Sequence, residues 1–314
     1  MRIVSLLPST TEILFAIGAG DLVVGVTFEC DHPPEARTRR IVSTSALPAG
    51  LAPAEIDAAV SARTAAGDDL YRLDAGALAD LDADLVVTQD LCTVCAVDAA
   101  DVEEALAHLG CDGRVLTVAP TDMEGVLASI LALGAAVGAH WRAEALVAGL
   151  RERLAAVRAR VAGTAAPRTL VLEWTDPPFA PGHWVPEMVA AAGGLCVLGR
   201  AGERSERVGW DDVAAAEPEV VVCAPCGLDL DAGARVAREA LERGLMPDGV
   251  PVWAVDANAS YARPGPRLVD GIEALAGILH PQLAGPPPAG AAQILRSTPT
   301  TTPASVTSSG TIGS

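Results

Sequence analysis

Strand patterns alternate with helical patterns along this chain, and the alternation occurs twice. Strands that alternate with helices at this spacing form βαβ units and a parallel sheet. The length of 314 residues allows two domains of ordinary size. The sequence therefore predicts an α/β fold with two Rossmann-like lobes, each built on a parallel sheet. The expected strands are 2–7, 22–27, 40–43, 85–89 and 114–118 in the first run, and 168–173, 195–198, 219–223 and 251–255 in the second.

A long helical pattern over residues 142–161 separates the two runs. Its apolar residues recur at intervals of three or four on one stripe, and its opposite face carries arginine and glutamate. One narrow stripe favours a helix that joins two lobes, while an ordinary surface helix of one larger domain is the alternative. The stripe consists of Leu146, Leu150, Leu154, Val157 and Val161.

The predicted organisation has four parts. An N-terminal lobe spans 1–140, a connecting helix spans 141–162, and a C-terminal lobe spans 163–283. From 284 to 314 the residues Ser, Thr, Pro and Gly dominate. Such a segment cannot bury enough apolar surface to offset the entropy lost on ordering, so we expect a disordered tail.

The first residues bear on the compartment. The apolar stretch from Ile3 to Leu7 is interrupted at Pro8, and Ser9-Thr-Thr-Glu12 has the spacing of a capping box that begins a helix. This stretch is shorter than the apolar part of a signal peptide, and no window reaches the ~18 apolar residues of a membrane helix. We therefore expect a cytoplasmic protein without membrane insertion. The formal net charge of −18 argues against nucleic acid as a partner, because phosphate binding needs a basic face.

Unusual side chains collect in the segments that follow predicted strands. In open parallel α/β sheets, ligands bind outside the carboxyl ends of the strands. Five such segments, two in the first run and three in the second, carry aromatic, charged, His or Cys residues. Aromatic walls with a few polar groups suit a flat, largely apolar organic ligand, although any one aromatic can instead plug the end of a sheet. The predicted ligand-binding residues are Phe28, Glu29, Asp31, Trp174, Phe179, His183, Trp184, Asn258, Tyr261 and Arg263.

Two cysteines form a Cys92-x-x-Cys95 motif in one of these segments. In a cytosolic protein this spacing indicates redox chemistry or half of a metal site. The next helix is expected to begin only near Asp98, which disfavours the redox interpretation because such thiols gain acidity at a helix start. A structural zinc site needs four Cys or His ligands, and Cys226 and His183 can complete one if the lobes approach. Zinc or iron held by these four residues is the alternative use of the same cleft.

Several motifs resemble the periplasmic-type binding proteins for cobalamin and iron–siderophores. The chain starts with Ile3-Val-Ser-Leu-Leu-Pro-Ser-Thr-Thr-Glu12, followed by Val23-Val-Gly-Val-Thr27 and Cys30-Asp-His-Pro-Pro34. The stretch 78–88 resembles the helix-then-strand element of the family. Within the family, the chain is similar to a cytoplasmic branch usually labelled cobalamin-binding. The segments that carry this likeness are 88–95, 182–187, 224–227 and 263–271.

The resemblance covers residues 1 to about 283. It implies a class III periplasmic-binding-protein fold, in which one rigid helix joins two α/β lobes with limited hinge motion. It also implies non-catalytic binding of cobalamin or a related corrinoid, which the protein presents to an ABC transporter permease. Cobalt accepts imidazole and thiolate, so His183 or a cysteine can contact the corrinoid. We expect a monomer. The alternatives are a cytosolic metal- or thiol-dependent enzyme that uses the Cys and His residues, and a regulatory protein that binds others through its acidic surface.

Overall fold

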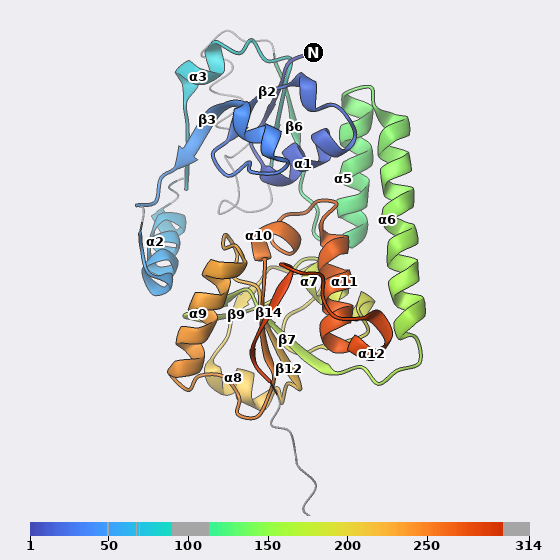
Figure 1. Cartoon of the computed structure of the whole chain (residues 1–314). Helices are drawn as coiled ribbons and strands as arrows, with labels where there is room; N and C mark the ends of the chain where they lie inside the picture. The colour runs from blue at the N-terminus through green and yellow to red at the C-terminus, as the bar shows by residue number, and fades with distance from the viewer. Residues whose placement is uncertain (49, 67, 69, 90–112, 298–314) are drawn as a thin grey trace, which may run out of the picture.

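The first half of the chain builds a six-stranded sheet in the order β4-β3-β2-β1-β5-β6 (Figure 1). The structure is a computed structural model that describes residues 1–48, 50–66, 68, 70–89 and 113–297. Neighbouring strands are parallel except β3 and β4, which are antiparallel. The central strands are entirely buried, as expected for a parallel sheet that is covered on both faces. The strands are β1 Ile3–Ser5, β2 Val23–Thr27, β3 Arg40–Ser45, β4 Tyr71–Leu73, β5 Leu85–Thr88 and β6 Arg114–Thr117.

Helices cover both faces of this first sheet. Ile3 and Val87 point to one face, where they join the core formed with the first helix. Val4 and Val86 point to the other face, where they pack with Leu78. This alternation along β1 and β5 follows from the two-residue period of a strand. The helices are α1 Pro8–Ala16, η1 Gly20–Leu22, η2 Pro34–Thr38, α2 Pro53–Ala66, α3 Ala75–Ala79 and α5 Met123–Ala136.

The second half builds a five-stranded sheet in the order β10-β7-β12-β13-β14. β10, β7, β12 and β13 are parallel to their neighbours, and β14 pairs antiparallel with β13. A separate three-stranded sheet has the order β11-β9-β8. The strands are β7 Arg168–Leu172, β8 Trp174–Thr175, β9 Pro178–Ala180, β10 Leu195–Cys196, β11 Glu206–Arg207, β12 Val220–Cys223, β13 Val252–Val255 and β14 Ala292–Arg296.

The α/β architecture with mainly parallel sheets confirms the predicted fold class. In the two larger sheets the edge strands β4 and β14 pair antiparallel with their neighbours, and both pairings of the small three-stranded sheet are antiparallel. The expectation of disorder from residue 284 onward is wrong for the described part of that segment, because β14 bonds along the free edge of β13. The helices of the second half are α7 Val185–Ala191, α8 Trp210–Ala215, α9 Leu230–Glu242, α10 Ala257–Ser260, α11 Leu268–Leu279 and α12 Pro281–Ala284.

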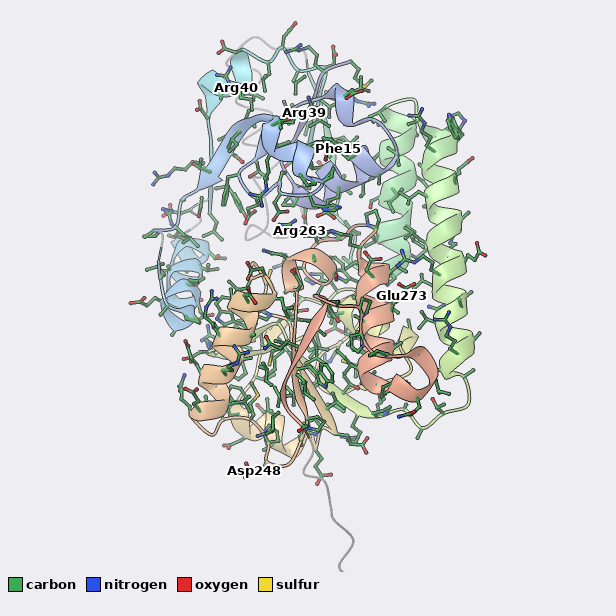
Figure 2. All side chains as sticks on the ribbon, viewed as in Figure 1. Phe15, Arg39, Arg40, Asp248, Arg263 and Glu273 are labelled. Carbon is green, nitrogen blue, oxygen red and sulfur yellow. The ribbon has the colours of Figure 1, made fainter. Side chains whose placement is uncertain are left out.

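The helix α6, His140–Val161, runs along one side of the molecule and contacts both halves (Figure 1). Its buried stripe follows the predicted one, except that Val147 takes the place expected for Leu146. Arg142 Nη1 donates to the carbonyl oxygen of Gly18 at 3.1 Å, in the first half. Arg153 binds Glu273 and Asp270 of α11, with an Nε–Oε1 distance of 2.9 Å to Glu273. Figure 2 shows Glu273 between α11 and α6. The helix is thus bound to both halves. The lobe boundaries at 140 and 162 stay a prediction.

Candidate functional site

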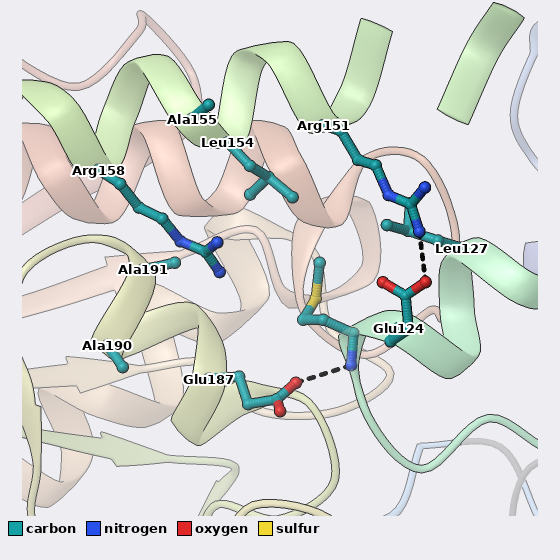
Figure 3. Close-up of a pocket in the computed structure, with 10 residues that line it drawn as sticks. Glu124, Leu127, Arg151, Leu154, Ala155, Arg158, Glu187, Ala190 and Ala191 are labelled. Carbon is teal, nitrogen blue, oxygen red and sulfur yellow. Dashed lines mark hydrogen bonds and ion pairs between the residues drawn. The ribbon is translucent and has the colours of Figure 1, made fainter. Parts of the chain in front are cut away.

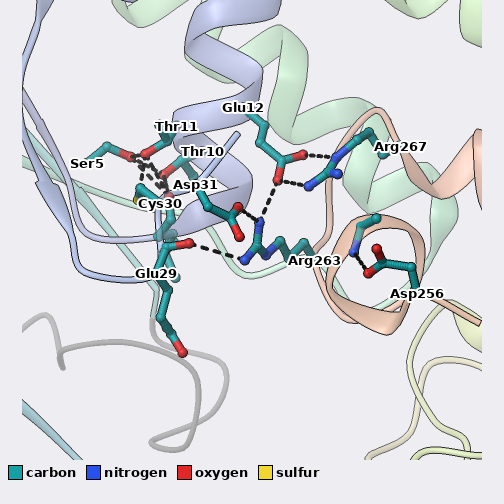
Figure 4. A network of polar contacts seen from close by, with 12 residues as sticks. Ser5, Thr10, Thr11, Glu12, Glu29, Cys30, Asp31, Asp256, Arg263 and Arg267 are labelled. Carbon is teal, nitrogen blue, oxygen red and sulfur yellow. Dashed lines mark hydrogen bonds and ion pairs between the residues drawn. The ribbon is translucent and has the colours of Figure 1, made fainter. Parts of the chain in front are cut away.

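The strand-end segments of the two halves meet directly at Arg263. This residue follows β13 and α10 in the second half, and its guanidinium reaches the segment that follows β2 in the first half (Figure 4). Nη1 lies 2.5 Å from Asp31 Oδ1, and Nη2 donates to the carbonyl oxygen of Glu29 at 3.1 Å. The carboxyl ends of β2 and β13 are therefore directed toward one another, as a ligand site between two parallel sheets requires.

Glu12 is the centre of this network, a role that differs from the helix cap expected of it. The side chain is 3% exposed. One carboxylate oxygen, Oε1, accepts from Arg263 Nη1 at 3.1 Å and from Arg267 Nη2 at 2.5 Å, and Oε2 accepts from Arg267 Nε at 2.8 Å. A buried carboxylate requires such partners, because an unpaired charge is strongly unfavourable away from water. Glu12, Arg263 and Arg267 thus join the two halves through charge-assisted hydrogen bonds.

The capping box expected at Ser9 to Glu12 is not formed. The residue that caps α1 is Leu7, with Pro8 in the first turn, and no side chain caps the helix. The hydroxyl groups of Thr10 and Thr11 both donate to the carbonyl oxygen of Leu7 at 3.1 Å. Proline fits the first turn of a helix because its missing N–H would have no partner there. Glu12 is therefore free to point away from the helix start and bind the arginines of the other half.

The charges around Arg263 stabilise one another. Burial alone would raise the pKa of Asp31, but its hydrogen bond to Arg263 and the charges of Arg263 and Arg267 lower the pKa overall. Burial likewise opposes the charge of Arg263, and Asp31 and Glu12 outweigh that effect and raise its pKa. Burial raises the pKa of Glu29, although Tyr71 donates to its Oε2 at 3.1 Å. The ion pair of Arg263 with Asp31 therefore persists at neutral pH.

The predicted aromatic residues fall into two groups. Phe28 is 41% exposed and lies 6.2 Å from the ring of Tyr71, and Trp174 and Phe179 are half-buried in the small sheet. Trp184 and Tyr261 are instead core residues, and Trp184 Nε1 donates to the carbonyl oxygen of Tyr261 at 2.7 Å. In this structure Trp184 and Tyr261 pack in the core and are almost inaccessible to a ligand.

His183 and Asn258 lie outside the network of Arg263. Asn258 is half-buried in α10, and His183 has a positive φ of 49°. Nε2 of His183 is buried and has no hydrogen-bond partner among the described residues. Burial lowers the pKa of His183, and the charge of Arg204 lowers it further. The neutral ring therefore offers no exposed Nε2 to a ligand in this conformation.

The proposed metal ligands are only partly placed. Cys92 and Cys95 lie outside the described residues, while Cys226 is exposed and His183 is half-buried. Within the ranges that the structure describes, no group of three or more His, Cys, Asp or Glu side chains has the arrangement of a metal site. Burial raises the pKa of three other thiols to about 12, so they remain protonated and unreactive at neutral pH. These thiols are Cys30, Cys196 and Cys223.

Glu173 is a second buried carboxylate near the strand ends. It follows β7 and accepts hydrogen bonds from Ser205 Oγ and, at 3.4 Å, from the N–H of Gly182. These bonds favour the charged form, but burial outweighs them and raises the pKa of Glu173 to about 7. Glu173 therefore holds the segment around Gly182 against the segment around Ser205 and titrates near neutral pH.

Glu173→Gln is expected to become more stabilising, relative to the native protein, as the pH rises from about 5 to about 8. The pKa of Glu173 is 4.5 in the unfolded chain and about 7 in the folded protein. At pH values between these two, Glu173 is ionised in the unfolded chain but protonated in the folded protein, so the free energy of unfolding falls as the pH rises. Glutamine removes this loss. Urea unfolding at both pH values measures the effect. Glu206→Gln, in the exposed strand β11, is the control, and a stability difference independent of pH would contradict the assignment.

A groove of about 630 Å³ lies away from these strand ends, between α5, α6 and α7 (Figure 3). Glu187 Oε2 accepts from the N–H of Met123 at 2.7 Å, and Arg151 binds Glu124 across the groove. On one side of the groove lies α6, and on the other side the start of α5 contacts α7. It does not include Arg263 or any of the predicted ligand-binding residues.

Two α/β halves on one connecting helix, with strand-end segments that meet between them, form the architecture of two-lobed ligand-binding proteins. Residues 3–248 match the periplasmic binding protein family, and the chain belongs to this family. This confirms the resemblance found in the sequence. A comparison with curated protein sequences gave no match.

Solved structures support the same fold. A periplasmic heme binding protein from Pseudomonas aeruginosa is 23% identical, with a TM-score of 0.68, and the match covers 95% of each chain. The periplasmic vitamin B12 binding protein BtuF of Vibrio cholerae is 20% identical, with a TM-score of 0.64 over 90% of this chain and 97% of that chain. The periplasmic heme-binding protein RhuT from Roseiflexus sp. RS-1 is 22% identical, with a TM-score of 0.63 over 90% of this chain and 98% of that chain.

The expectation of a cytoplasmic protein is wrong. The family is one of periplasmic binding proteins, and the similar solved structures are periplasmic as well. The expectation rested on the short apolar stretch before Pro8. Ile3 and Val4 in that stretch are fully buried in the central strand β1, so its hydrophobicity reflects the sheet core and carries no information about export. Across the described ranges, no helix combines the length and apolar character needed to cross a membrane.

Proposed function

We propose that this protein binds a corrinoid such as cobalamin between the facing strand ends and presents it to an ABC transporter permease. It acts as a monomer and without catalysis. The observation that carries the proposal is the direct contact of the segments after β2 and β13 through Arg263. Family membership and the likeness to heme and vitamin B12 binding proteins support a metal chelate as the ligand.

The charges at the strand ends favour a corrinoid over heme. Heme carries two carboxylates, whereas the peripheral amides of cobalamin are neutral and form hydrogen bonds. Within the described cluster, Arg263 and Arg267 are already bound by Glu12 and Asp31. The remaining carboxyl group, Glu29, offers no attraction to an anion. A neutral chelate therefore fits this cluster better than a dianionic one.

The buried thiols of Cys30 and Cys223 are unsuited to catalysis and fit a binding protein. A thiol with a pKa near 12 is a poor nucleophile, because the thiolate is the reactive form. The half-buried and exposed aromatic rings of Phe28, Trp174 and Phe179 supply instead the apolar surface that a flat macrocycle needs. They follow strands of both sheets, so a ligand held between them contacts both halves.

Cyanocobalamin and hemin are the probes that test the proposal. Titration of the purified full chain, followed by equilibrium dialysis and by the visible spectrum, is expected to give saturable 1:1 binding of cyanocobalamin. Hemin is expected to bind at least about tenfold more weakly, because desolvated like charges oppose its carboxylates. Tighter binding of hemin would overturn the choice of ligand. Binding of neither chelate would overturn the proposed function.

Phe28→Ala is expected to weaken cyanocobalamin binding by about tenfold, the loss expected when a ligand no longer covers an aromatic ring. Phe28 is 41% exposed, so the folded protein should remain stable. Trp141→Ala is the matched control, since Trp141 is 60% exposed at the start of α6. Equal affinities of the Phe28→Ala variant and the native protein would remove Phe28 from the site.

A further inference from the structure

The helix α2 belongs to the first half of the chain but touches the second half, on the side of the molecule opposite α6 (Figure 1). None of its residues is buried. Its half-buried positions lie mainly three or four residues apart and form one face: Pro53, Ile56, Asp57, Ala59, Val60 and Arg63. A helix of this length is marginal in water on its own, so contacts with the rest of the protein must hold it in place.

Two polar contacts fasten α2 to the small sheet of the second half. Arg207 Nη2 lies 2.9 Å and 2.6 Å from the two carboxylate oxygens of Asp57. The side chain of Asp57 is only 15% exposed, whereas that of Arg207 is 52% exposed. At the start of the helix, Trp174 Nε1 donates to the carbonyl oxygen of Pro53 at 3.2 Å, while it also donates to the carbonyl oxygen of Asp176 in its own half at 3.1 Å. Both contacts cross from one half of the molecule to the other.

The anchors of α2 are also neighbours of the proposed ligand site. Trp174 is one of the aromatic residues that we assign to the ligand. The guanidinium of Arg207 lies 5.7 Å from the ring centroid of Phe179, a second such residue. A movement of α2 away from the small sheet therefore leaves the indole N–H of Trp174 with Asp176 as its acceptor and frees the charge that lies over Phe179.

We propose that α2 is a latch, held by the Asp57–Arg207 ion pair, that closes the side of the ligand site opposite α6 and must open before the ligand leaves. The statement about the ligand rests on the proposed function, whereas the attachment of α2 does not. A partly exposed ion pair contributes modestly to stability, which suits a contact that opens and closes repeatedly. On the other side, α6 is fixed to α11 by two ion pairs of Arg153.

Hydrogen exchange of the ligand-free full chain tests the latch first. Asp57→Ala is expected to raise the exchange rates of amides in residues 53–66 by about three- to tenfold. The double variant Asp57→Arg with Arg207→Asp is expected to restore slow exchange. Asp68→Ala is the matched control, because this exposed carboxylate lies just after α2 and its ion pair is with Arg63 of α2 rather than with the second half. Unchanged exchange in Asp57→Ala, or no restoration in the double variant, would overturn the latch.

Dissociation of bound cyanocobalamin, measured by chase with excess unlabelled ligand, tests the role of the latch at the site. Release is expected to be about three- to tenfold faster from Asp57→Ala than from the native protein or Asp68→Ala. Equal release rates would overturn the gating role. If the native protein binds no cyanocobalamin, the proposed function fails, and hydrogen exchange still decides whether the Asp57–Arg207 pair holds α2.

Discussion

Replacing Glu12 with alanine is expected to lower the free energy of unfolding by about 3 kcal/mol, because it leaves buried guanidinium charge without its partner. The side chains of Arg263 and Arg267 are 9% and 22% exposed, so water compensates little for the lost carboxylate. Arg263 keeps its ion pair with Asp31, and Arg267 loses both hydrogen bonds that it donates to Glu12. Urea unfolding at pH 7, followed by circular dichroism, measures the change.

Glu12→Gln and Glu35→Ala are the controls for this prediction. Glutamine keeps an oxygen that accepts hydrogen bonds but removes the charge, so it should lose less stability than alanine. Glu35 is an exposed carboxylate in η2, and its replacement should change the free energy of unfolding by less than about 0.5 kcal/mol. If Glu12→Ala were as stable as Glu35→Ala, the network would not be what holds α1 to the second half.

The ion pairs of Glu12 could not be predicted from the residues around it in the sequence. Its spacing from Ser9 is that of a local capping box, while its actual partners lie more than 250 residues away in the chain. Local spacing cannot distinguish these two uses of a glutamate. One observation could have identified it: Glu12 precedes the apolar run Ile13-Leu14-Phe15 in a short helix, and a carboxylate that is carried into a core needs a charged partner. Arg263 and Arg267, which lie four residues apart, are the charged partners.

The regular elements could be predicted because their patterns are local. The strand β5 and the helix α6 lie within a few residues of their expected bounds. The strand β14 was missed because it follows a Pro- and Gly-rich segment and gains its order only from pairing with β13. The helix α2 was missed because its sequence is rich in alanine and none of its residues is buried. Elements that depend on distant partners leave a weak pattern in the sequence.

The segments after strands pointed correctly to the region where the halves meet, but not to the role of each residue. Arg263 and Asp31 were expected to bind ligand, and the structure pairs them with each other. Trp184 and Tyr261 come after strands like the other aromatic residues, yet both are buried. A position after a strand determines the edge of the sheet at which a side chain lies. It does not determine whether that side chain faces a ligand, an ion-pair partner or the core.

Gly182→Ala is expected to destabilise the protein by about 3 kcal/mol, since overpacking against backbone atoms leaves little room for relaxation. A Cβ atom at this position would lie 2.3 Å from the backbone nitrogen of Ser205 and 2.5 Å from the carbonyl oxygen of Glu203. The two segments must then move apart. That movement breaks the hydrogen bond from His183 N to Glu203 O, which is 2.6 Å long, and withdraws Gly182 from Glu173. Urea unfolding measures the loss of stability.

Gly149→Ala is the matched control, and its effect should have the opposite sign. Gly149 lies in α6 with no atom within 4 Å of a Cβ, so alanine gains about 1 kcal/mol from its higher helix propensity. The same chemical change thus separates a steric effect from a propensity effect. The Gly182→Ala variant should also bind cyanocobalamin more weakly, because the segment that moves follows β9 and Phe179. If the Gly182→Ala variant were as stable as the native protein, the segment around Ser205 would be able to move at little cost. The close packing over Glu173 would then not constrain the site.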